Sequence, residues 1–164
     1  MTEVWMALPY TKPPLSLNDR GASRGASFAK AAATRTLREQ VVALAEAAGL
    51  PRNLDHVTVQ LHYRPRDNRR RDTDNLVATL KPIADALTPG KQARTVTRAG
   101  KTRRLPAQAG YGMVADDTPH YMSKPEPIIH PAIKGEPGLL WVTVTWQTVA
   151  EAVAEVAARQ QLTA

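Results

Sequence analysis

Three short segments alternate apolar and polar residues with a period of two, which is typical of strands that bury one face. They are residues 4–8, which end before Pro9, residues 57–62, and residues 140–147, where the alternation is clearest. Because successive side chains of a strand point to opposite sides, each segment predicts one buried row and one row facing solvent.

Three other segments repeat apolar residues with the helical period. The first covers residues 28–48 and ends at Gly49, a natural C-cap, with Pro51 blocking continuation. The others cover residues 75–87 and 150–161. The side chains expected to face the core are Leu37, Val41, Leu44 and Ala48 in the first helix and Val153 and Val156 in the last.

The order of these elements is strand, helix, strand, helix, one or two strands, and helix. It predicts an α/β or α+β fold in which two to three helices pack on a small mixed sheet. A length of 164 residues suits a single domain over 1–164. Residues 89–111 are polar, basic and glycine-containing, and are expected to be a loop inserted in this domain.

Composition narrows the classes of function. Lys and Arg outnumber Asp and Glu by 22 to 15, which favours a polyanionic partner such as nucleic acid. The absence of cysteine excludes disulfides, thiolate zinc sites and thiol catalysis. No secretion signal and no apolar run of about 18 residues is present, so a cytoplasmic location is expected. The histidines have no ligand spacing and are expected to be surface or structural residues: His56, His62, His120 and His130.

The chemistry is concentrated where Asp72-Thr73-Asp74 follows directly after Arg69–Arg71. Two carboxylates can hold a divalent cation while the arginines hold a polyanion beside it. If the segment is extended, both carboxylates point to one side and repel each other unless a cation bridges them. Magnesium needs few protein carboxylates because it keeps several waters. A second acidic pair, Asp116-Asp117, is a candidate to complete the site.

The helix that begins near Asp74 has two distinct faces. At about 100° per residue, Ala78, Lys81 and Asp85 follow Asp74 on one side, and Pro82 is expected to kink the axis. An alternative interpretation is an ordinary solvated face with an Asp N-cap and a Lys81–Asp85 ion pair, and Asp116-Asp117 before Pro119 equally suits an N-cap. The opposite side is apolar and expected to be buried: Leu76, Leu80, Ile83 and Leu87.

These residues resemble the RusA family of Holliday-junction resolvases over most of residues 3–147. The resemblance rests first on Arg70-Arg71-Asp72-Thr73-Asp74-Asn75-Leu76. It continues with Asp85-Ala86-Leu87, with Val114 to Asp117, and with the strand at 140–147. Near the N-terminus, Leu8-Pro9, Pro13-Pro14 and Asn18-Asp19-Arg20 also match.

The resemblance implies a homodimeric endodeoxyribonuclease, with no organic cofactor, that resolves four-way DNA junctions in recombination and repair. Its metal would be Mg²⁺, for which Mn²⁺ can substitute, bound as one or two ions by the catalytic carboxylates of Asp72, Asp74 and Asp117. Asp85, Asp116 and Asn75 would have supporting roles. Hydrolysis would leave a 5′-phosphate and a 3′-hydroxyl.

The chain departs from the family at two places. Where the family has a catalytic lysine, four residues after the second Asp, this chain has Ala78, and Lys81 on the same face is expected to serve instead. The basic stretch within 89–111 replaces a short turn, and is either a DNA-gripping element or a disordered insertion. The side chains expected to contact DNA are Arg20, Arg69, Arg70, Arg71, Lys91, Arg94, Arg98, Lys101, Arg103 and Arg104.

Three other interpretations remain open. The chain could be a non-catalytic basic DNA-binding module that has kept the fold, an interpretation that Ala78 favours. It could be a restriction-type Mg²⁺ nuclease, but the acid-x-Lys pair which that class needs does not follow Asp72. It could also be a basic structural protein, in which case the order of the Asp pairs is coincidental.

Overall fold

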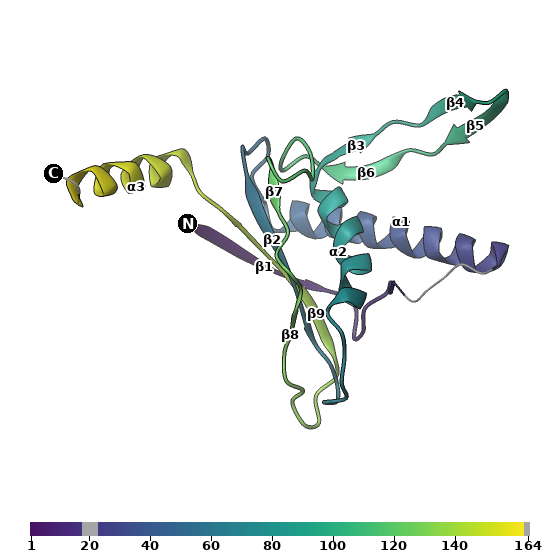
Figure 1. Ribbon diagram of the computed structural model, residues 1–164, viewed down its shortest axis with the longest axis horizontal. Helices are drawn as coiled ribbons and strands as arrows, with labels where there is room; N and C mark the ends of the chain where they lie inside the picture. The colour runs from purple at the N-terminus through teal and green to yellow at the C-terminus, as the bar shows by residue number, and fades with distance from the viewer. Residues whose placement is uncertain (18–22, 163–164) are drawn as a thin grey trace.

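The computed structural model describes residues 1–17 and 23–162. A five-stranded mixed sheet forms its centre, with the order β1–β9–β2–β7 and β8 also pairing with β2 (Figure 1). β9 runs antiparallel to both of its neighbours, whereas β7 and β8 run parallel to β2. The strands are β1 (Thr2–Leu8), β2 (Val57–Arg64), β7 (Met122–Ser123), β8 (Ile128–Ile129) and β9 (Leu139–Trp146).

One face of this sheet is buried under two helices. The register pairs Val144 of β9 with Val4 of β1 and with Val59 of β2, so the alternating rows of three strands align on the same side. The helices α1 (Arg24–Ala47) and α2 (Asp74–Leu87) pack there and form one continuous apolar core with the sheet. Full burial of each Val, Leu or Ile contributes about 1.5–3 kcal/mol to folding. The expected α+β fold with a small mixed sheet and three helices is confirmed.

The ends of α1 follow from local chemistry. The Ser23 hydroxyl caps the start by accepting a hydrogen bond from the backbone N–H of Ala26 at 3.2 Å. Gly49 ends the helix with φ of +60°, a conformation that glycine adopts without strain. The predicted apolar stripe is correct at Leu37 and Val41, but Ala45 is buried in the last turn and Ala48 is exposed.

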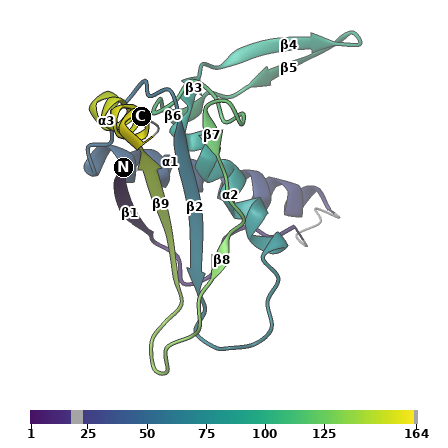
Figure 2. The same ribbon diagram turned by 60° about the vertical axis from the view of Figure 1, so that its left-hand side comes forward.

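The prediction of a loop over residues 89–111 is wrong. This segment is a long hairpin, hereafter the arm, made of two successive antiparallel ladders. Figures 1 and 2 show it extending well beyond the body of the molecule. Ala99 and Gly100 form its tip with φ of 49° and 73°, as a two-residue hairpin turn of type I′ requires. The strands are β3 (Pro89–Lys91), β4 (Arg94–Arg98), β5 (Lys101–Leu105) and β6 (Gln108–Tyr111).

The last helix, α3 (Val149–Leu162), projects from the opposite side of the molecule (Figure 1). Val153 is 64% exposed, so the prediction that it faces inward is wrong, and the side chain of Val156 lies outside the described part. The N-terminal ammonium of Met1 contacts the Glu151 carboxylate at 2.6 Å. Within residues 1–17 and 23–162, no helix has both the length and the apolarity to cross a membrane.

Candidate functional site

The helix α2 has the two faces that its sequence predicts. Its apolar row is buried, whereas Asp74 and Lys81 on the other side are exposed and Asp85 is half-buried. The helix continues through Pro82 to Leu87. The buried row consists of Leu76, Leu80, Ile83 and Leu87.

The Asp72-Thr73-Asp74 segment is not extended. Thr73 has helical dihedral angles, with φ of −65° and ψ of −30°, and stands as the N-cap of a helix that begins at Asp74. The extended backbone that would project both carboxylates to one side is therefore not formed, and the prediction based on it is wrong. Asp72 and Asp74 are both exposed, and the Thr73 hydroxyl donates a hydrogen bond to the carboxylate of Glu126.

The later acidic pair meets α2 at Lys81. The Nζ of Lys81 lies 2.6 Å from Oδ2 of Asp117 and 2.6 Å from Oδ1 of Asp85, and the Nζ of Lys124 lies 3.0 Å from the same Asp117 oxygen. The bond from Lys81, with help from Lys124 and against partial burial, lowers the pKa of Asp117 to about 2. Burial alone would lower the pKa of Lys81, but its bonds to Asp117 and Asp85 outweigh burial and raise it.

Buried neighbours fix the position of Asp117. The chain before it is anchored at Val114, which bridges to Leu54, and at Met113, whose N–H donates to the Leu87 carbonyl at 2.7 Å. The chain after it re-enters the core at Met122. No helix follows Asp116 or Asp117 in this described stretch, so the N-cap interpretation of that pair is wrong.

Instead, residues 118–122 form a turn. The N–H groups of Tyr121 and Met122 both bond to the Thr118 carbonyl at 2.9 Å. Asp116 is exposed and accepts a hydrogen bond from the backbone N–H of Asp117 at 2.8 Å.

The expected metal ligands are not gathered into one cluster. In the part of the chain that the structure describes, no group of three Asp, Glu or His side chains is arranged to hold a metal ion. Lys81, the partner of Asp117, lies two turns after Asp74, about 10 Å along the helix axis. Three carboxylates are a donor set that suits Mg²⁺. In this arrangement, however, the Lys81 ammonium contacts the Asp117 carboxylate that would bind the cation. The metal site formed by the three aspartates therefore stays a prediction.

A cleft of about 580 Å³ opens at the start of α2. Lys12, Arg70 and Arg71 give it positive charge, and Asp72 is its acidic residue. Asn75 also lines the cleft, and its side-chain oxygen accepts a hydrogen bond from Ser16 at 3.2 Å. A larger hollow of about 1030 Å³ lies between α3 and the sheet. Among the described side chains, Asp55 and His56 are its only titratable ones, and none of the expected site residues lines it.

The arginine run is partly engaged within its own loop. Arg71 binds Asp67 through Nη2 at 2.6 Å from Oδ1 and through Nη1 at 2.8 Å from the backbone carbonyl. The bond from Arg71, followed by the N–H of Arg69, lowers the pKa of Asp67. The side chains of Arg69 and Arg70 are exposed. Arg20, another expected DNA contact, lies outside the described residues.

Arg38 is a residue whose importance the sequence analysis missed. It lies in the buried stripe of α1 and is only 7% exposed. Its guanidinium donates to the Ala109 carbonyl at 3.0 Å and to the Asp85 carbonyl at 3.2 Å, and lies 3.4 Å from the Asp85 carboxylate. Arg38 therefore joins α1, α2 and the root of the arm. The sequence carried one signal of this role, namely an arginine within the apolar stripe predicted for the helix.

The solvent-facing side of the sheet carries a second group that was missed. His62 Nδ1 and His130 Nε2 lie 3.1 Å apart, and the rings of His62 and Trp141 are stacked at 5.1 Å. Burial, followed by the nearby His130, lowers the pKa of His62. Trp5 continues this aromatic row and is 52% exposed.

Comparison with known proteins assigns no family. Neither a scan against protein-family models nor a search of the curated proteins finds a match to this chain. The resemblance to junction resolvases therefore rests on the sequence motifs alone.

Proposed function

We propose that this chain is a Mg²⁺-dependent, structure-selective endodeoxyribonuclease of the RusA type that resolves four-way junctions by paired phosphodiester hydrolysis. The observation that carries the proposal is the contact between Lys81 and Asp117. It joins the helix that begins at Asp74 to an acidic pair more than thirty positions later. The contact supports the proposal because it brings the acidic pair to the polar face of the helix that starts at Asp74.

Each residue has a role that its chemistry supports. Asp72, Asp74 and Asp117 would hold the metal, which when bound neutralises phosphate charge and acidifies a water. Lys81 would place a compact positive charge on a phosphate oxygen where negative charge develops. Hydrolysis adds water across the P–O3′ bond, so the hydroxyl joins phosphorus and the proton leaves with the 3′ oxygen. Asp85 holds the ammonium of Lys81 at 2.6 Å and would orient it.

The geometry of α2 also supports Lys81 as the functional lysine of this chain. Ala78, which occupies the position of the family lysine, is half-buried and packs against the core. Lys81 is exposed and reaches both Asp85 and Asp117. A homodimer with two-fold symmetry would match the near two-fold symmetry of a four-way junction and place one site on each of two opposed strands.

The proposal is tested with a synthetic four-way junction, incubated with Mg²⁺ or with EDTA. We expect paired nicks that depend on Mg²⁺. Asp74→Asn should abolish them, a larger loss than the roughly 10–100-fold that follows removal of a residue merely supporting a metal ligand. The variant should still bind the junction, because the lost negative charge would only have repelled the DNA phosphates.

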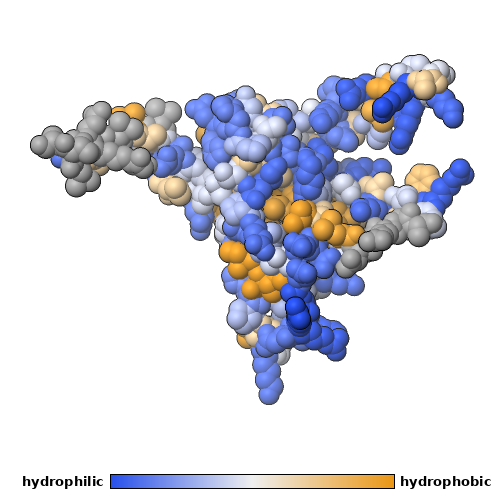
Figure 3. All heavy atoms as spheres, in the orientation of Figure 1, coloured by the Kyte–Doolittle hydropathy of each residue, from blue (hydrophilic) through white to orange (hydrophobic). Residues whose placement is uncertain are grey.

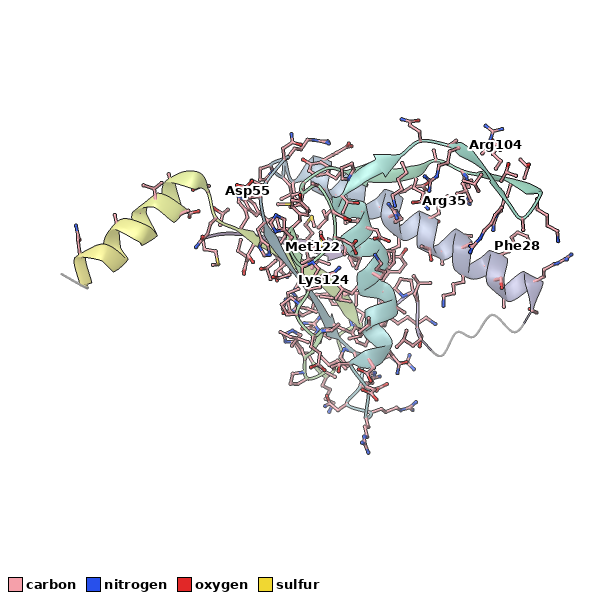
Figure 4. The ribbon with its side chains drawn as sticks, turned by 45° about the horizontal axis from the view of Figure 1, so that its top comes forward. Phe28, Arg35, Asp55, Arg104, Met122 and Lys124 are labelled. Atoms are coloured by element: carbon pink, nitrogen blue, oxygen red, sulfur yellow. The ribbon has the colours of Figure 1, made fainter. Side chains whose placement is uncertain are left out.

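Asp55→Asn is the matched control. It makes the same chemical change at an exposed carboxylate that lines the hollow beside α3 (Figure 4), and it should cleave as wild type does. Undiminished cleavage by Asp74→Asn would remove Asp74 from the site.

One observation favours a second candidate, a DNA-binding module without catalysis. Both Lys81 and Lys124 contact Asp117, so this carboxylate already has cationic partners. A protein that binds junctions tightly but gives no nick in Mg²⁺ or Mn²⁺ would support the module and contradict the nuclease.

A further inference from the structure

The two faces of the arm differ sharply in charge. Strand pairing places directly opposed residues on the same side of the ribbon. The hydroxyl oxygens of Thr97 and Thr102, which form one such pair, lie 3.1 Å apart. The pairs on this hydroxyl face are Thr95 with Arg104 and Thr97 with Thr102. The pairs on the other, hereafter the cationic face, are Arg94 with Leu105, Val96 with Arg103, and Arg98 with Lys101.

The cationic face therefore holds four of the five basic side chains between positions 94 and 104, along about 13 Å of strand. All four are exposed, and the whole arm contains no Asp or Glu. No carboxylate among the described residues forms an ion pair with them. Like charges held this close repel each other and favour a polyanion that spans them. Hydrophilic side chains stand along the arm in Figure 3, with small apolar patches between them.

The root of the arm is built to hold a fixed direction. Gly110 approaches its neighbours so closely that an added Cβ would lie 2.3 Å from the backbone N of Gly90 and 2.4 Å from the Thr88 carbonyl. Arg38 binds the carbonyl of Ala109 from the side of α1. The ribbon thus leaves the body at an anchored point and runs in the same general direction as the first half of α1, where Arg35 and Phe28 lie (Figure 4).

We propose that the arm binds double-stranded nucleic acid through its cationic face, with Arg94, Arg98, Lys101 and Arg103 on the phosphate backbone. This inference rests on the proposed function and assigns the arm to a duplex flank of the DNA, away from the reacting phosphate. A duplex carries one charge per about 1.7 Å of axis with both strands counted, so about eight phosphates lie along 13 Å of it, more than the four cations of the ribbon. A two-stranded ribbon also fits the major groove, which is about 12 Å wide.

The test is equilibrium binding of a duplex and of a four-way junction, measured by fluorescence anisotropy in EDTA over a range of KCl concentrations. The variant Arg94→Gln/Arg98→Gln/Lys101→Gln/Arg103→Gln removes the four charges. Because each phosphate contact contributes about 0.9 to the salt slope, we expect the slope to fall by about three to four. Affinity at about 0.1 M KCl should fall at least tenfold. The melting temperature should not change, since these side chains are exposed.

A face-swapped variant provides a control of identical composition and charge. It moves two arginines and one lysine to neighbouring threonine positions and puts threonine in their place. Threonine favours strands, so the ribbon should keep its geometry. We expect it to bind more weakly than the wild type, because only Arg103 stays on the cationic face, and more strongly than the glutamine variant, because the arm keeps its charge. Wild-type binding by either variant would overturn the inference. Binding to anionic phosphatidylserine vesicles should also be measured for the glutamine variant. If that variant loses vesicle binding but binds the duplex as wild type does, the inference is overturned as well. The substitutions are Arg94→Thr, Thr95→Arg, Thr97→Arg, Arg98→Thr, Lys101→Thr and Thr102→Lys.

These outcomes are separable from those of the nuclease test. A wild-type protein that fails to nick junctions, but whose salt slope falls in the glutamine variant, would contradict the nuclease and support the arm. A protein that nicks junctions, but whose glutamine variant binds DNA unchanged, would contradict the arm alone.

Discussion

Two arginine-rich segments of this molecule use their charge differently. In the loop at 66–71, Asp67 lies among the cations, binding Arg71 at 2.6 Å and lying 3.8 Å from Arg66 and 4.0 Å from Arg69. In the arm there is no carboxylate at all. A run of basic residues in a sequence therefore does not tell how much charge is available to a partner. The available charge depends on whether folding brings a carboxylate into contact with the basic side chains.

The two segments also differ in how firmly their arginine side chains are held. Arg71 is half-buried and donates to the backbone carbonyls of Asp67 and Arg69 as well as to the Asp67 carboxylate, so it holds in place the chain that leads to Asp72. The arm arginines stand on an exposed ribbon and form no ion pair with a carboxylate of residues 1–17 or 23–162. We infer that the loop shapes the cleft at the start of α2, whereas the arm supplies general affinity for a polyanion.

The largest effect expected is loss of the anchor that holds the arm. Arg38→Met removes the buried guanidinium from the Ala109 carbonyl and from Asp85, whose carboxylate keeps Lys81 and whose carbonyl keeps Thr88. Loss of a buried hydrogen-bond partner costs about 1–3 kcal/mol. We expect a large drop in the melting temperature, read by circular dichroism. Arg35→Met, at an exposed position one turn earlier on α1, should change stability by no more than about 0.5 kcal/mol. Equal melting temperatures for the two variants would show that Arg38 anchors nothing.

A smaller effect should follow from removing the acid in the 66–71 loop. Asp67→Asn removes the carboxylate that opposes the charge of Arg71 and should increase the salt slope of DNA binding by about one, the value of one added phosphate contact. Asp55→Asn changes the net charge equally, but at the opposite end of β2 from the arginine loop, and should leave the slope unaltered. If both variants change the salt slope by the same amount, Asp67 does not reduce the charge that the loop offers to DNA.

The Asp117 carboxylate is the most strongly shifted acid of the site, and its pH dependence has a definite sign. Its pKa is lowered from 3.8 to about 2, so its pairing stabilises the fold fully above pH 3.8 and is lost as the pH falls through about 2. Carbon-detected NMR should follow this titration directly. In Lys81→Met the Asp117 pKa should move up toward its ordinary value. A pKa that stays near 2 in that variant would assign the shift to Lys124.

The smallest effect concerns the tip of the arm. Ala99 holds a left-handed conformation that costs an L-residue about 1–2 kcal/mol, and Ala99→Gly relieves it. Amide hydrogen exchange should slow in β4 and β5, while exchange in β2 stays as in the wild type. Faster exchange along the whole arm would mean that the tip is not strained.

Most of the body could be predicted from the sequence because apolar periodicity records burial. Leu76, Leu80, Ile83 and Leu87 define the inner face of α2, and the alternation at 140–147 defines β9. The arm could not be predicted in this way, because both of its faces are exposed and its strands show no apolar alternation.

Long-range contacts were equally hidden. His62 and His130 pair across 68 positions, and β7 and β8 are two residues each, too short for any period. For the site, the sequence predicted the Lys81–Asp85 pair, which is local to one helix face. It gave no means of seeing that Lys124 and Arg38, from other segments, also contact these carboxylates.

The proposed function depends on Asp72, Asp74 and Asp117 forming one metal site, in which Asp117 exchanges an ammonium partner for a cation. Titration of the labelled protein with Mn²⁺, followed by paramagnetic broadening of amide resonances, tests it most directly. We predict that amides at 72–74 and at 116–118 broaden together, and that Asp117→Asn weakens the broadening of both groups. Broadening confined to 72–74 and indifferent to Asp117→Asn would contradict the claim.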